Sequence, residues 1–475
     1  MVRTRFSPSP TGLIHIGNAR AALFSALYAA KEKGVFLLRI EDTDLARSEQ
    51  KYTELLQEDL HWLGLAWQEG PGVGGPYQPY WQSQRHDLYD RYYTELENRK
   101  LVYPCFCTDQ ELALNRKLQL SRGQAPRYPG TCQRLSQEDI TNKLKKGLKP
   151  ALRFRVPAKK TIEFVDLVKG SQRFNSDDMG DFIVRRQEGT ASFLFCNAID
   201  DSLMEVTHVL RGDDHLANTP RQLMLLEALD MRAPQYGHLS MITGDDGAPL
   251  SKRQGSFSLH DLYQHGYLAI AVLNYMARLS HTYELQSLMN FKELADYFKL
   301  EKLSRSPARF DKNQLLHWQK ESVIALDTRA TLDWLGVEIM EKVPEEKHTV
   351  FVDVMRKNIL FPQEAHRWAD ALFCDELQFT HEQIHLFQEA SESFFIEAAL
   401  AVKKYGIDFK NVCDDLKEKL NVSGKKLFMP LRIALTGEQH GPELAQIAAL
   451  LGKEKILQRF AYALELVRKE NVTNL

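Results

Sequence analysis

The sequence has few cysteines, no long apolar segment and no signal-peptide pattern. Six cysteines among 475 residues are too few for the disulfide framework of a small secreted protein. The most apolar segment, residues 267–279, is interrupted by Asn274 and Arg278 and is shorter than the roughly 20 residues that cross a bilayer. The N-terminus has arginines but no apolar core. These absences predict a cytoplasmic protein with no membrane partner.

A strong excess of charge is also absent. The formal net charge is −2, so the surface as a whole is not that of a uniformly basic nucleic-acid-binding protein. Basic segments at residues 142–149, 402–406 and 423–427 remain candidates for phosphate contacts. The chain is too long for one hydrophobic core, so two to four domains are expected.

The N-terminal part predicts a parallel sheet. Residues 2–6 form a strand pattern, residues 17–33 a helix pattern, and residues 35–40 a continuous apolar strand that ends in acidic residues. A strand that is apolar on both faces is typical of a parallel sheet, and strand–helix–strand is its building unit. The expected fold class is a doubly wound, Rossmann-like α/β domain.

The segment from residue 103 to about residue 180 interrupts this pattern. It combines three cysteines, a lysine-rich stretch and short β-like pieces, which indicates an inserted α+β subdomain. The α/β pattern resumes near residue 180 and includes a helix with Thr219 as N-cap and Pro220 at its first position. A strand is expected at residues 235–243.

Strand patterns nearly vanish beyond residue 256, and the C-terminal third is predicted to be all-α. One helix is expected to begin at Thr380, with Gln383 three residues later in a capping-box spacing. Apolar residues then recur at helical intervals as far as Val402.

The first candidate site is the turn before the N-terminal helix. A helix N-terminus presents unpaired N–H groups and a partial positive charge, so it attracts phosphate. His15 stands there and can donate a hydrogen bond to a phosphoryl oxygen. Gly12 and Gly17 leave room for a flat base. Taken alone, the turn is also compatible with an ordinary strand-to-helix connection that carries a surface histidine.

The second candidate site is Lys252, in a segment bracketed by Gly244, Gly247 and Gly255. The glycines predict a loop. A lysine there is suited to the negative charge that develops in phosphoryl or adenylyl transfer. Taken alone, this segment is also compatible with a plain basic loop.

Together the two stretches resemble the paired signatures of class I aminoacyl-tRNA synthetases. Residues 15–18 (HIGN) follow the first strand and residues 250–253 (LSKR) the last one. Four further stretches are similar to the bacterial-type glutamyl-tRNA synthetase family, in the family's order: residues 5–17, 37–44, 197–222 and 425–437. The resemblance implies ATP-dependent ligation of glutamate to tRNA, with Mg²⁺ accompanying ATP.

The resemblance also implies five parts of the chain. Two halves of the catalytic domain are expected at residues 1–102 and 181–255, separated by an acceptor-end-binding insertion at 103–180. A stem-contact helical domain is expected at 256–325 and an anticodon-binding domain at 326–475. His15 and Lys252 are the implied catalytic residues. The implied ATP-binding residues are Pro10, Gly12, His15, Gly17, Asn18, Ser251, Lys252 and Arg253.

Glutamate has two carboxylates and one ammonium, whose minimal complement is two arginines and one acid. The planar fork of Arg5 can grip a carboxylate, and the resemblance assigns it the γ-carboxylate. Arg211 is expected at the other carboxylate region, and Glu41 at the ammonium. The full set of implied glutamate-binding residues is Arg5, Ser7, Ser9, Glu41, Phe193, Asn197 and Arg211.

Three positions depart from the family pattern. Phe193 stands where most members have tyrosine, Pro249 replaces the first lysine of the second signature, and Asn18 replaces the last histidine of the first. The first two changes put details of the amino-acid and pyrophosphate contacts in doubt, but not the reaction.

A third candidate site is a cysteine cluster. Cys105 and Cys107 are one residue apart and Cys132 follows, a spacing compatible with zinc. Residues 87–207 contain no histidine, so the fourth ligand is not a local imidazole. The resemblance offers Tyr128, because the family in places uses a Tyr-x-x-x-Cys pair. One structural Zn²⁺ and three reduced cysteines without metal both remain open.

The expected protein is therefore a monomeric ligase that charges tRNA(Glu) with glutamate by way of glutamyl-adenylate, releasing AMP and pyrophosphate. The sequence leaves open whether tRNA(Gln) is charged as well. Two alternatives remain: an enzyme that glutamylates a modified base in tRNA, and a tRNA-binding protein with an inactive synthetase core.

Overall fold

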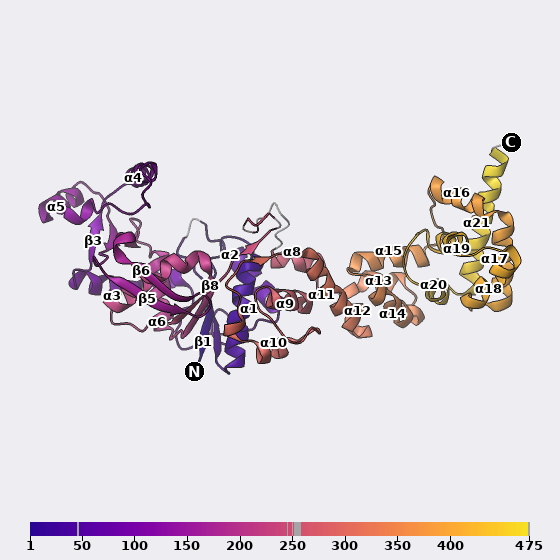
Figure 1. The fold of residues 1–475 in the computed structure, drawn as a ribbon, viewed down its shortest axis with the longest axis horizontal. Helices are drawn as coiled ribbons and strands as arrows, with labels where there is room; N and C mark the ends of the chain where they lie inside the picture. The colour runs from indigo at the N-terminus through magenta and orange to yellow at the C-terminus, as the bar shows by residue number, and fades with distance from the viewer. Residues whose placement is uncertain (45–46, 245, 249, 251–257, 474–475) are drawn as a thin grey trace. The chain divides into compact units, whose positions relative to one another are not determined.

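The computed structural model describes residues 1–44, 47–244, 246–248, 250 and 258–473. The chain divides into two compact units (Figure 1). The first unit holds Met1–Gln264 and Ala269–Leu315, and the second holds His265–Leu268 and Leu316–Leu475. No helix of the described residues is long and apolar enough to pass through a membrane.

A four-stranded parallel sheet forms the centre of the first unit, which confirms the predicted α/β fold. Its strands lie in the order β2 (Val35–Leu38), β1 (Arg3–Phe6), β8 (His208–Gly212) and β9 (Gln235–Leu239). Helix α1 (Ile16–Lys31) connects β1 to β2 and buries most of its alanine-rich surface. Because all four strands are parallel, their carboxyl ends meet at one edge, where ligands bind in such sheets.

The helices around this sheet carry several polar residues of the site. Those of the first unit are α2 (Gln50–Trp62), α3 (His86–Asn98), α6 (Phe193–Leu203), α7 (Thr219–Ala228), α8 (Leu259–Gln264), α9 (Ala269–Arg278) and α10 (Phe291–Tyr297). Helix α6 packs on α3, where the rings of Tyr93 and Phe195 stack with centroids 4.4 Å apart.

The prediction that Thr219 caps α7 is wrong. The cap is Asn218, and Thr219 is the first helical residue, with Pro220 after it. The 3₁₀ turn Asp213–Asn218 runs directly into α7, so Thr219 already has helical backbone angles. Its hydroxyl accepts a hydrogen bond from Arg211 instead of closing the helix end.

The inserted segment forms its own antiparallel sheet, in the order β3 (Val102–Cys105), β4 (Ala151–Phe154) and β7 (Phe182–Arg185). It also contains the hairpin of β5 (Thr161–Asp166) and β6 (Gly170–Asn175), and helices α4 (Asp109–Ser121) and α5 (Gln137–Lys145). Strand β7, predicted to resume the parallel sheet, belongs to this sheet. Its burial alternates along the strand, as expected for an antiparallel sheet with one covered face.

The predicted strand 235–243 is two strands in two sheets. Strand β9 ends at Leu239, and β10 (Ile242–Thr243) pairs with β11 (Ala308–Arg309). The chain turns between them, where the Ser240 hydroxyl donates a hydrogen bond to the carbonyl of Ser304.

The second unit is helical over its described residues and surrounds one apolar core. Its helices after α11 (Lys312–Ala325) are α12 (Thr328–Leu335), α13 (Val337–Lys342), α14 (His348–Asn358), α15 (Pro362–Phe373), α16 (His381–Ala390), α17 (Glu392–Tyr405), α18 (Phe409–Leu420), α19 (Lys425–Thr436), α20 (Leu444–Leu451) and α21 (Lys453–Thr473). The capping box at Thr380 is confirmed. The helix expected from there to Val402 is broken at Ser391, which has a φ of 78° and separates α16 from α17.

Candidate active site

The N-terminal turn borders a cavity at the carboxyl edge of the parallel sheet. His15 is the residue before α1, with an extended backbone. The cavity, of ≈ 220 Å³, is lined by His15, Gly17, Asn18, Arg20, Ala21, Gly212, Asp214, Leu239, Ser240, Met241, Ile242 and Leu250. A Cβ added at Gly17 would meet no atom within 4 Å, so the backbone here is open to a ligand.

The segment predicted to carry the second signature begins and ends beside this turn. Leu250 lines the same cavity as His15. Ser258 forms a β-bridge with His15, and the amide of Leu259 donates to the carbonyl of Ile14 at 2.9 Å. Ser251, Lys252 and Arg253, with Pro249 before them, lie outside the described residues. Their predicted ATP contacts therefore stay predictions, although both flanks of the segment reach the His15 turn.

Two other predicted ATP-binding residues do not line this cavity. The carbonyl of Pro10 accepts a hydrogen bond from the amide of Glu49 at 3.1 Å. Gly12 has open space around its added Cβ, so nothing in the fold requires glycine there. A role for both in ATP binding stays a prediction.

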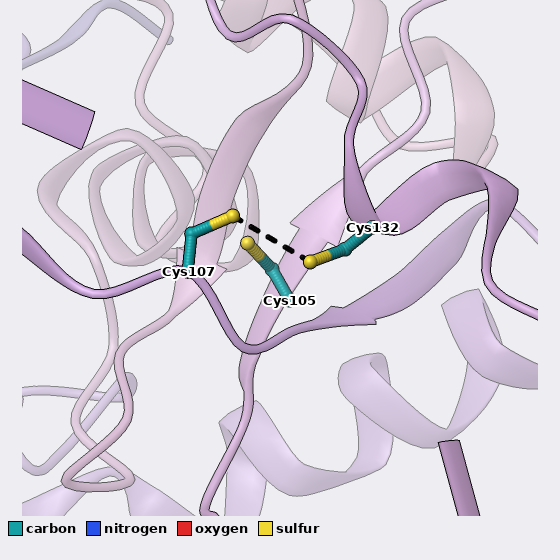
Figure 2. Close-up of side chains that lie close together, drawn as sticks. All are labelled: Cys105, Cys107 and Cys132. Atoms are coloured by element: carbon teal, nitrogen blue, oxygen red, sulfur yellow. Dashed lines mark hydrogen bonds between the residues drawn. The ribbon is translucent and has the colours of Figure 1, made fainter. Parts of the chain in front are cut away.

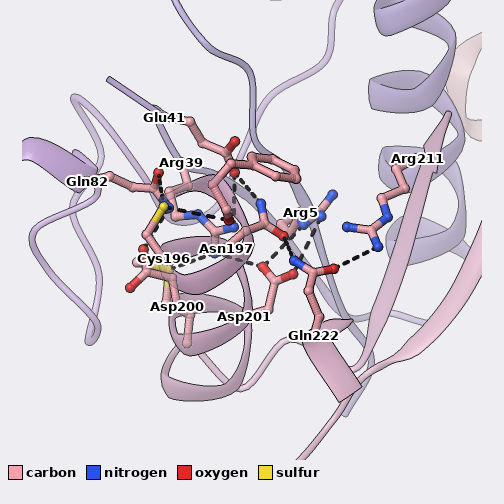
Figure 3. A network of polar contacts seen from close by, with 12 residues as sticks. Arg5, Arg39, Glu41, Gln82, Cys196, Asn197, Asp200, Asp201, Arg211 and Gln222 are labelled. Carbon is pink, nitrogen blue, oxygen red and sulfur yellow. Dashed lines mark hydrogen bonds and ion pairs between the residues drawn. The ribbon is translucent and has the colours of Figure 1, made fainter. Parts of the chain in front are cut away.

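A buried polar network lies beside the turn and brings four predicted glutamate-binding residues together: Arg5, Glu41, Asn197 and Arg211 (Figure 3). Arg5 on β1 forms an ion pair with Asp201 on α6, with Nε and Oδ1 3.3 Å apart. Asp201 also pairs with Arg39 at 2.8 Å. Burial alone would raise the pKa of Asp201, but the two arginines outweigh it and hold that pKa below its usual value.

Glu41 lies three residues after the end of β2 and receives two donors. Asn197 on α6 donates its amide to Glu41, and Arg39 lies 3.3 Å from the same carboxylate oxygen. Burial raises the pKa of Glu41 against the opposing effect of Arg39 and Arg5. One carboxylate oxygen thus takes both contacts, which leaves acceptor capacity for a cationic group in the site.

Arg211 on β8 is buried without a carboxylate partner among the described residues. Its Nη2 donates to Thr219 and to Gln222, both at 2.8 Å, and its Nε faces His238 at 3.3 Å. Its Nη1 is buried and has no hydrogen-bond partner within the part of the chain that the structure describes. Burial lowers the pKa of Arg211 to about 10. A buried cation held only by neutral groups is a site that an anion would stabilise.

The three remaining predicted residues differ in placement. The Ser7 hydroxyl is buried and finds no hydrogen-bond partner among the residues that the structure describes, so it is available to a ligand. Ser9 is exposed. Phe193 is half-buried and lies against His215, with ring centroids 5.1 Å apart. Burial lowers the pKa of His215 to about 4, so this ring is neutral at physiological pH.

Sequence reasoning missed several members of the network. They are Arg39, Asp201, Thr219, Gln222 and His238. Arg39 lies within the apolar stretch 35–40 and Asp201 within an apolar helical stretch, and a charged residue in such a position signals a buried ion pair. Thr219, Gln222 and His238 carry no such signal, because only the fold brings them to Arg211.

The predicted cysteine cluster is assembled in the insertion (Figure 2). The sulfur atoms of Cys105, Cys107 and Cys132 all lie within 4.8 Å of one another. The Tyr128 hydroxyl lies 3.5 Å from the sulfurs of Cys105 and Cys107. Arg153 donates from Nε to Cys105 at 3.1 Å, which favours the thiolate form of this sulfur.

Two family models match the chain. The catalytic domain of class I tRNA synthetases for glutamate and glutamine matches residues 1–317, and an anticodon binding domain matches residues 345–464. A glutamate–tRNA ligase 2 from Nitrosococcus oceani is 51% identical over 458 residues, covering 96% of this chain and 97% of the relative. One from Coxiella burnetii is 49% identical over 463 residues, covering 98% and 100%.

Solved structures show the same similarity. The crystal structure of a glutamate tRNA ligase from Elizabethkingia meningosepticum, in complex with its amino acid, aligns with a TM-score of 0.87 at 28% identity and covers 98% of this chain and 99% of its own. The glutamate–tRNA synthetase of Elizabethkingia anophelis aligns equally well, with a TM-score of 0.87.

Proposed function

The chain belongs to the class I tRNA synthetases for glutamate and glutamine, and we propose that it is an enzyme that charges tRNA with glutamate at the expense of ATP. The observation that carries the glutamate assignment is Arg211, a buried guanidinium that has no carboxylate partner, and at Nη1 no hydrogen-bond partner, in the described part of the chain. Arg5 and Glu41 lie in the same network. With Arg211 they offer two cations and one acid to a substrate with two carboxylates and one ammonium, while Arg39 and Asp201 pair with each other.

In the first step, the α-carboxylate of glutamate attacks the α-phosphorus of ATP. This forms glutamyl-adenylate and expels pyrophosphate. His15, at the N-terminal end of α1 and on the cavity wall, donates to the phosphates, and Lys252 neutralises the developing charge. Mg²⁺ enters with ATP as part of the substrate, so no protein ligands are assigned to it.

Glutamine is rejected by its amide. The NH₂ group of glutamine facing the donors of Arg5 would leave buried donors unpaired, and such mismatches discriminate strongly. In the second step, the 2′-hydroxyl of the terminal ribose of tRNA attacks the adenylate and takes the glutamyl group, releasing AMP. Positioning and charge stabilisation supply the catalysis, so no covalent enzyme intermediate is needed.

The insertion is assigned to the acceptor end of tRNA(Glu), and the second unit to its anticodon arm. The anticodon-domain match within the second unit supports the latter. We propose a monomer that acts in the cytoplasm; both assignments come from the sequence. tRNA(Gln) is a second tRNA substrate to be tested beside tRNA(Glu).

The cysteine cluster fits one structural zinc ion. Tetrahedral zinc with sulfur ligands at about 2.3 Å places those sulfurs about 3.8 Å apart, and the sulfurs of Cys107 and Cys132 lie 3.6 Å apart. Cys105, Cys107, Cys132 and Tyr128 would hold the ion. Zinc there would cross-link the end of β3 to the 3₁₀ turn Cys132–Arg134 and take no part in the reaction.

ATP–pyrophosphate exchange tests the function. We expect exchange that depends on glutamate, measured with and without tRNA(Glu), and formation of glutamyl-tRNA(Glu). No exchange under either condition would favour a tRNA-binding protein with an inactive core. Glutamate transferred to an internal base of tRNA would favour the base-modifying alternative. An enzyme of that kind is expected to lack the large helical second unit. Parallel charging of tRNA(Gln) decides the second substrate.

A further inference from the structure

A buried histidine–aspartate pair lies directly behind Arg211. His238 on β9 and Asp166 at the end of β5 have fully buried side chains, with Nδ1 and Oδ2 2.5 Å apart. On its other side, Nε2 of His238 lies 3.3 Å from Nε of Arg211 and 3.0 Å from the Thr219 hydroxyl. The imidazole therefore bridges a carboxylate and the guanidinium that the proposed function assigns to substrate.

The hydrogen bonds fix the protonation of this ring. Oδ1 of Asp166 accepts from three backbone amides, of Val168, Lys169 and His238, at 2.7 to 3.2 Å, which favours an ionised carboxylate. Nδ1 of His238 therefore carries a proton and donates it to Oδ2. Nε of Arg211 can only donate, so Nε2 of His238 must accept. The ring is thus neutral with its proton on Nδ1, and burial, which lowers the pKa of His238, agrees.

This arrangement sets the plane of the Arg211 guanidinium. His238 holds Nε on one side, while Thr219 and Gln222 hold Nη2 on the other. Of the three guanidinium nitrogens, only Nη1 has no hydrogen-bond partner among the described residues. Gln222 continues the network by donating to Asn197, which donates to Glu41 (Figure 3).

The aspartate comes from the insertion rather than from the parallel sheet. Asp166 closes the turn of the β5–β6 hairpin, and the amide of Leu167 donates to the carbonyl of Tyr236 on β9 at 2.8 Å. Gly237 permits this approach, since a Cβ there would lie 2.7 Å from Leu210 and 3.3 Å from Leu167. Lys169 further fixes the turn through an ion pair with Asp213 at 3.0 Å.

We propose that Asp166 and His238 are positioning residues that orient Arg211 toward the substrate carboxylate by holding the imidazole in its Nδ1-protonated form. The proposal rests on the glutamate site described above. It makes the insertion hairpin a structural part of that site.

Two substitutions of His238 separate positioning from stability. In His238→Asn the amide can still donate toward Asp166, but no acceptor reaches Arg211. In His238→Gln the longer side chain can present an acceptor to Arg211, but Asp166 loses its partner. We expect the KM for glutamate in ATP–pyrophosphate exchange to rise about tenfold to a hundredfold in His238→Asn and less than about fivefold in His238→Gln. The thermal stabilities should rank in the opposite order, because His238→Gln leaves a buried carboxylate unpaired.

Asp166→Asn tests the tautomer. Its amide oxygen can keep the turn contacts, while its NH₂ group faces Nδ1 of His238 and forces the proton to Nε2. We expect the KM for glutamate to rise as in His238→Asn, with the KM for ATP within about twofold of the wild-type value, as expected for a loss confined to one subsite. His281→Gln is the control, because this buried imidazole contacts the backbone of Lys299 and no residue of the glutamate site.

The ¹⁵N chemical shifts of His238 provide a readout that does not depend on activity. We expect a protonated Nδ1 in the wild-type protein and a protonated Nε2 in Asp166→Asn. A wild-type protein without glutamate-dependent exchange would refute the proposed function and leave this measurement to decide the tautomer. An active wild-type enzyme with Nε2 protonated, or with equal KM values in His238→Asn and His238→Gln, would overturn the positioning role.

Discussion

Arg3 and Arg5 stand two residues apart on the same strand and have different partners. Both point to the same side of β1, since side chains alternate along a strand. Arg3 pairs with Glu69 on a neighbouring loop, whereas Arg5 shares Asp201 with Arg39. Asp201 therefore keeps one arginine partner when Arg5 engages a ligand. The strand alone cannot distinguish the two arginines, and their different roles follow from what lies opposite each one.

Arg5→Ala is expected to lose most of the glutamate activation at low glutamate concentration while ATP still binds. The substitution removes the proposed γ-carboxylate partner, and Arg39 continues to neutralise Asp201, so the fold survives. Loss of a charge-assisted contact costs about 1.5–3 kcal/mol, enough to raise the KM for glutamate by more than about tenfold. Exchange kinetics and ATP binding by calorimetry measure the two effects. Arg3→Ala is the matched control, and unchanged glutamate kinetics in Arg5→Ala would refute the pocket assignment.

Asp59 gives the first unit a pH-dependent stability. Burial raises the pKa of Asp59 to about 6, although His260 lies 3.6 Å away and opposes the shift. The unfolded pKa is about 3.9, so the folded state binds this proton more tightly. The stabilisation is complete below about pH 4 and is lost as the pH rises through about 6.

Asp59→Asn should remove that dependence. We expect the variant to unfold at a higher temperature than the wild type at pH 8. At pH 5 this difference should shrink or reverse, by an amount equivalent to about 1 kcal/mol. Thermal unfolding at both pH values measures this. Glu54→Gln, on the exposed face of the same helix, should change neither value. A variant less stable than wild type at pH 8 would contradict the prediction.

The residues predictable from the sequence are those within contiguous motifs. Arg5, Glu41, Asn197 and Arg211 lie in stretches that resemble a family, and the structure brings them into one network. His238 lies in a plain strand pattern, and its contact with Arg211 depends on the register between β8 and β9. Tertiary register of this kind cannot be read from local pattern.

At the scale of elements, the two-residue capping box at Thr380 was a sound signal, whereas the single cap residue Thr219 and the continuous apolar period through Ser391 were not. The capping box at Thr380 is present because side chain and backbone satisfy each other within four residues. The break at Ser391 has no such local cause: Ser391 adopts a positive φ, which is rare for serine, and the apolar period continues across it. Phe387 on α16 packs against Phe395 on α17 across the break, with ring centroids 5.3 Å apart.

The cysteine cluster connects the end of β3 to the 3₁₀ turn Cys132–Arg134. Removing its metal should therefore destabilise the insertion and leave the rest of the chain unchanged. Protein prepared without chelator is expected to contain about one zinc per chain by elemental analysis. Cys107→Ser should lose the zinc and increase amide hydrogen exchange in β3 and the following turn, with ATP binding unchanged. Cys413→Ser, a buried cysteine of the second unit, is the control. Absence of zinc from the wild-type protein would refute the site.

At the scale of the whole molecule, the division into units does not follow the chain order. His265–Leu268 belong to the second unit although the chain returns to the first afterwards. The carbonyl of Gly266 accepts hydrogen bonds from Gln319 at 3.2 Å and Trp334 at 3.0 Å. The sequence analysis placed residues 256–325 in one domain and so did not predict this crossing, because it depends on long-range contacts such as those of Gly266.

The near-neutral charge of the chain means that tRNA contacts must come from local patches. Lys425 and Lys426 begin α19 and are exposed, and no ion pair of the described residues involves them. Two cations at a helix N-terminus oppose the helix dipole, so the helix itself gains nothing from them. By contrast Lys404 and Lys419 pair with Asp415. The unpaired lysines are therefore the better candidates for phosphate.

Replacing Lys425 and Lys426 with glutamate should weaken tRNA use without harming the fold. Acidic residues in the first turn stabilise a helix, so the thermal stability should be equal or higher, and a loss of charging cannot be ascribed to unfolding. We expect the KM for tRNA(Glu) to rise about tenfold and its salt dependence to become shallower, because fewer phosphate contacts are formed. Aminoacylation at two salt concentrations measures both. Lys419→Glu is the opposite case, because it breaks ion pairs with Glu397 and Asp415. Its main effect should be a lower thermal stability, with little change in the KM for tRNA(Glu). An unchanged KM in the double variant would place the tRNA contacts of the second unit elsewhere.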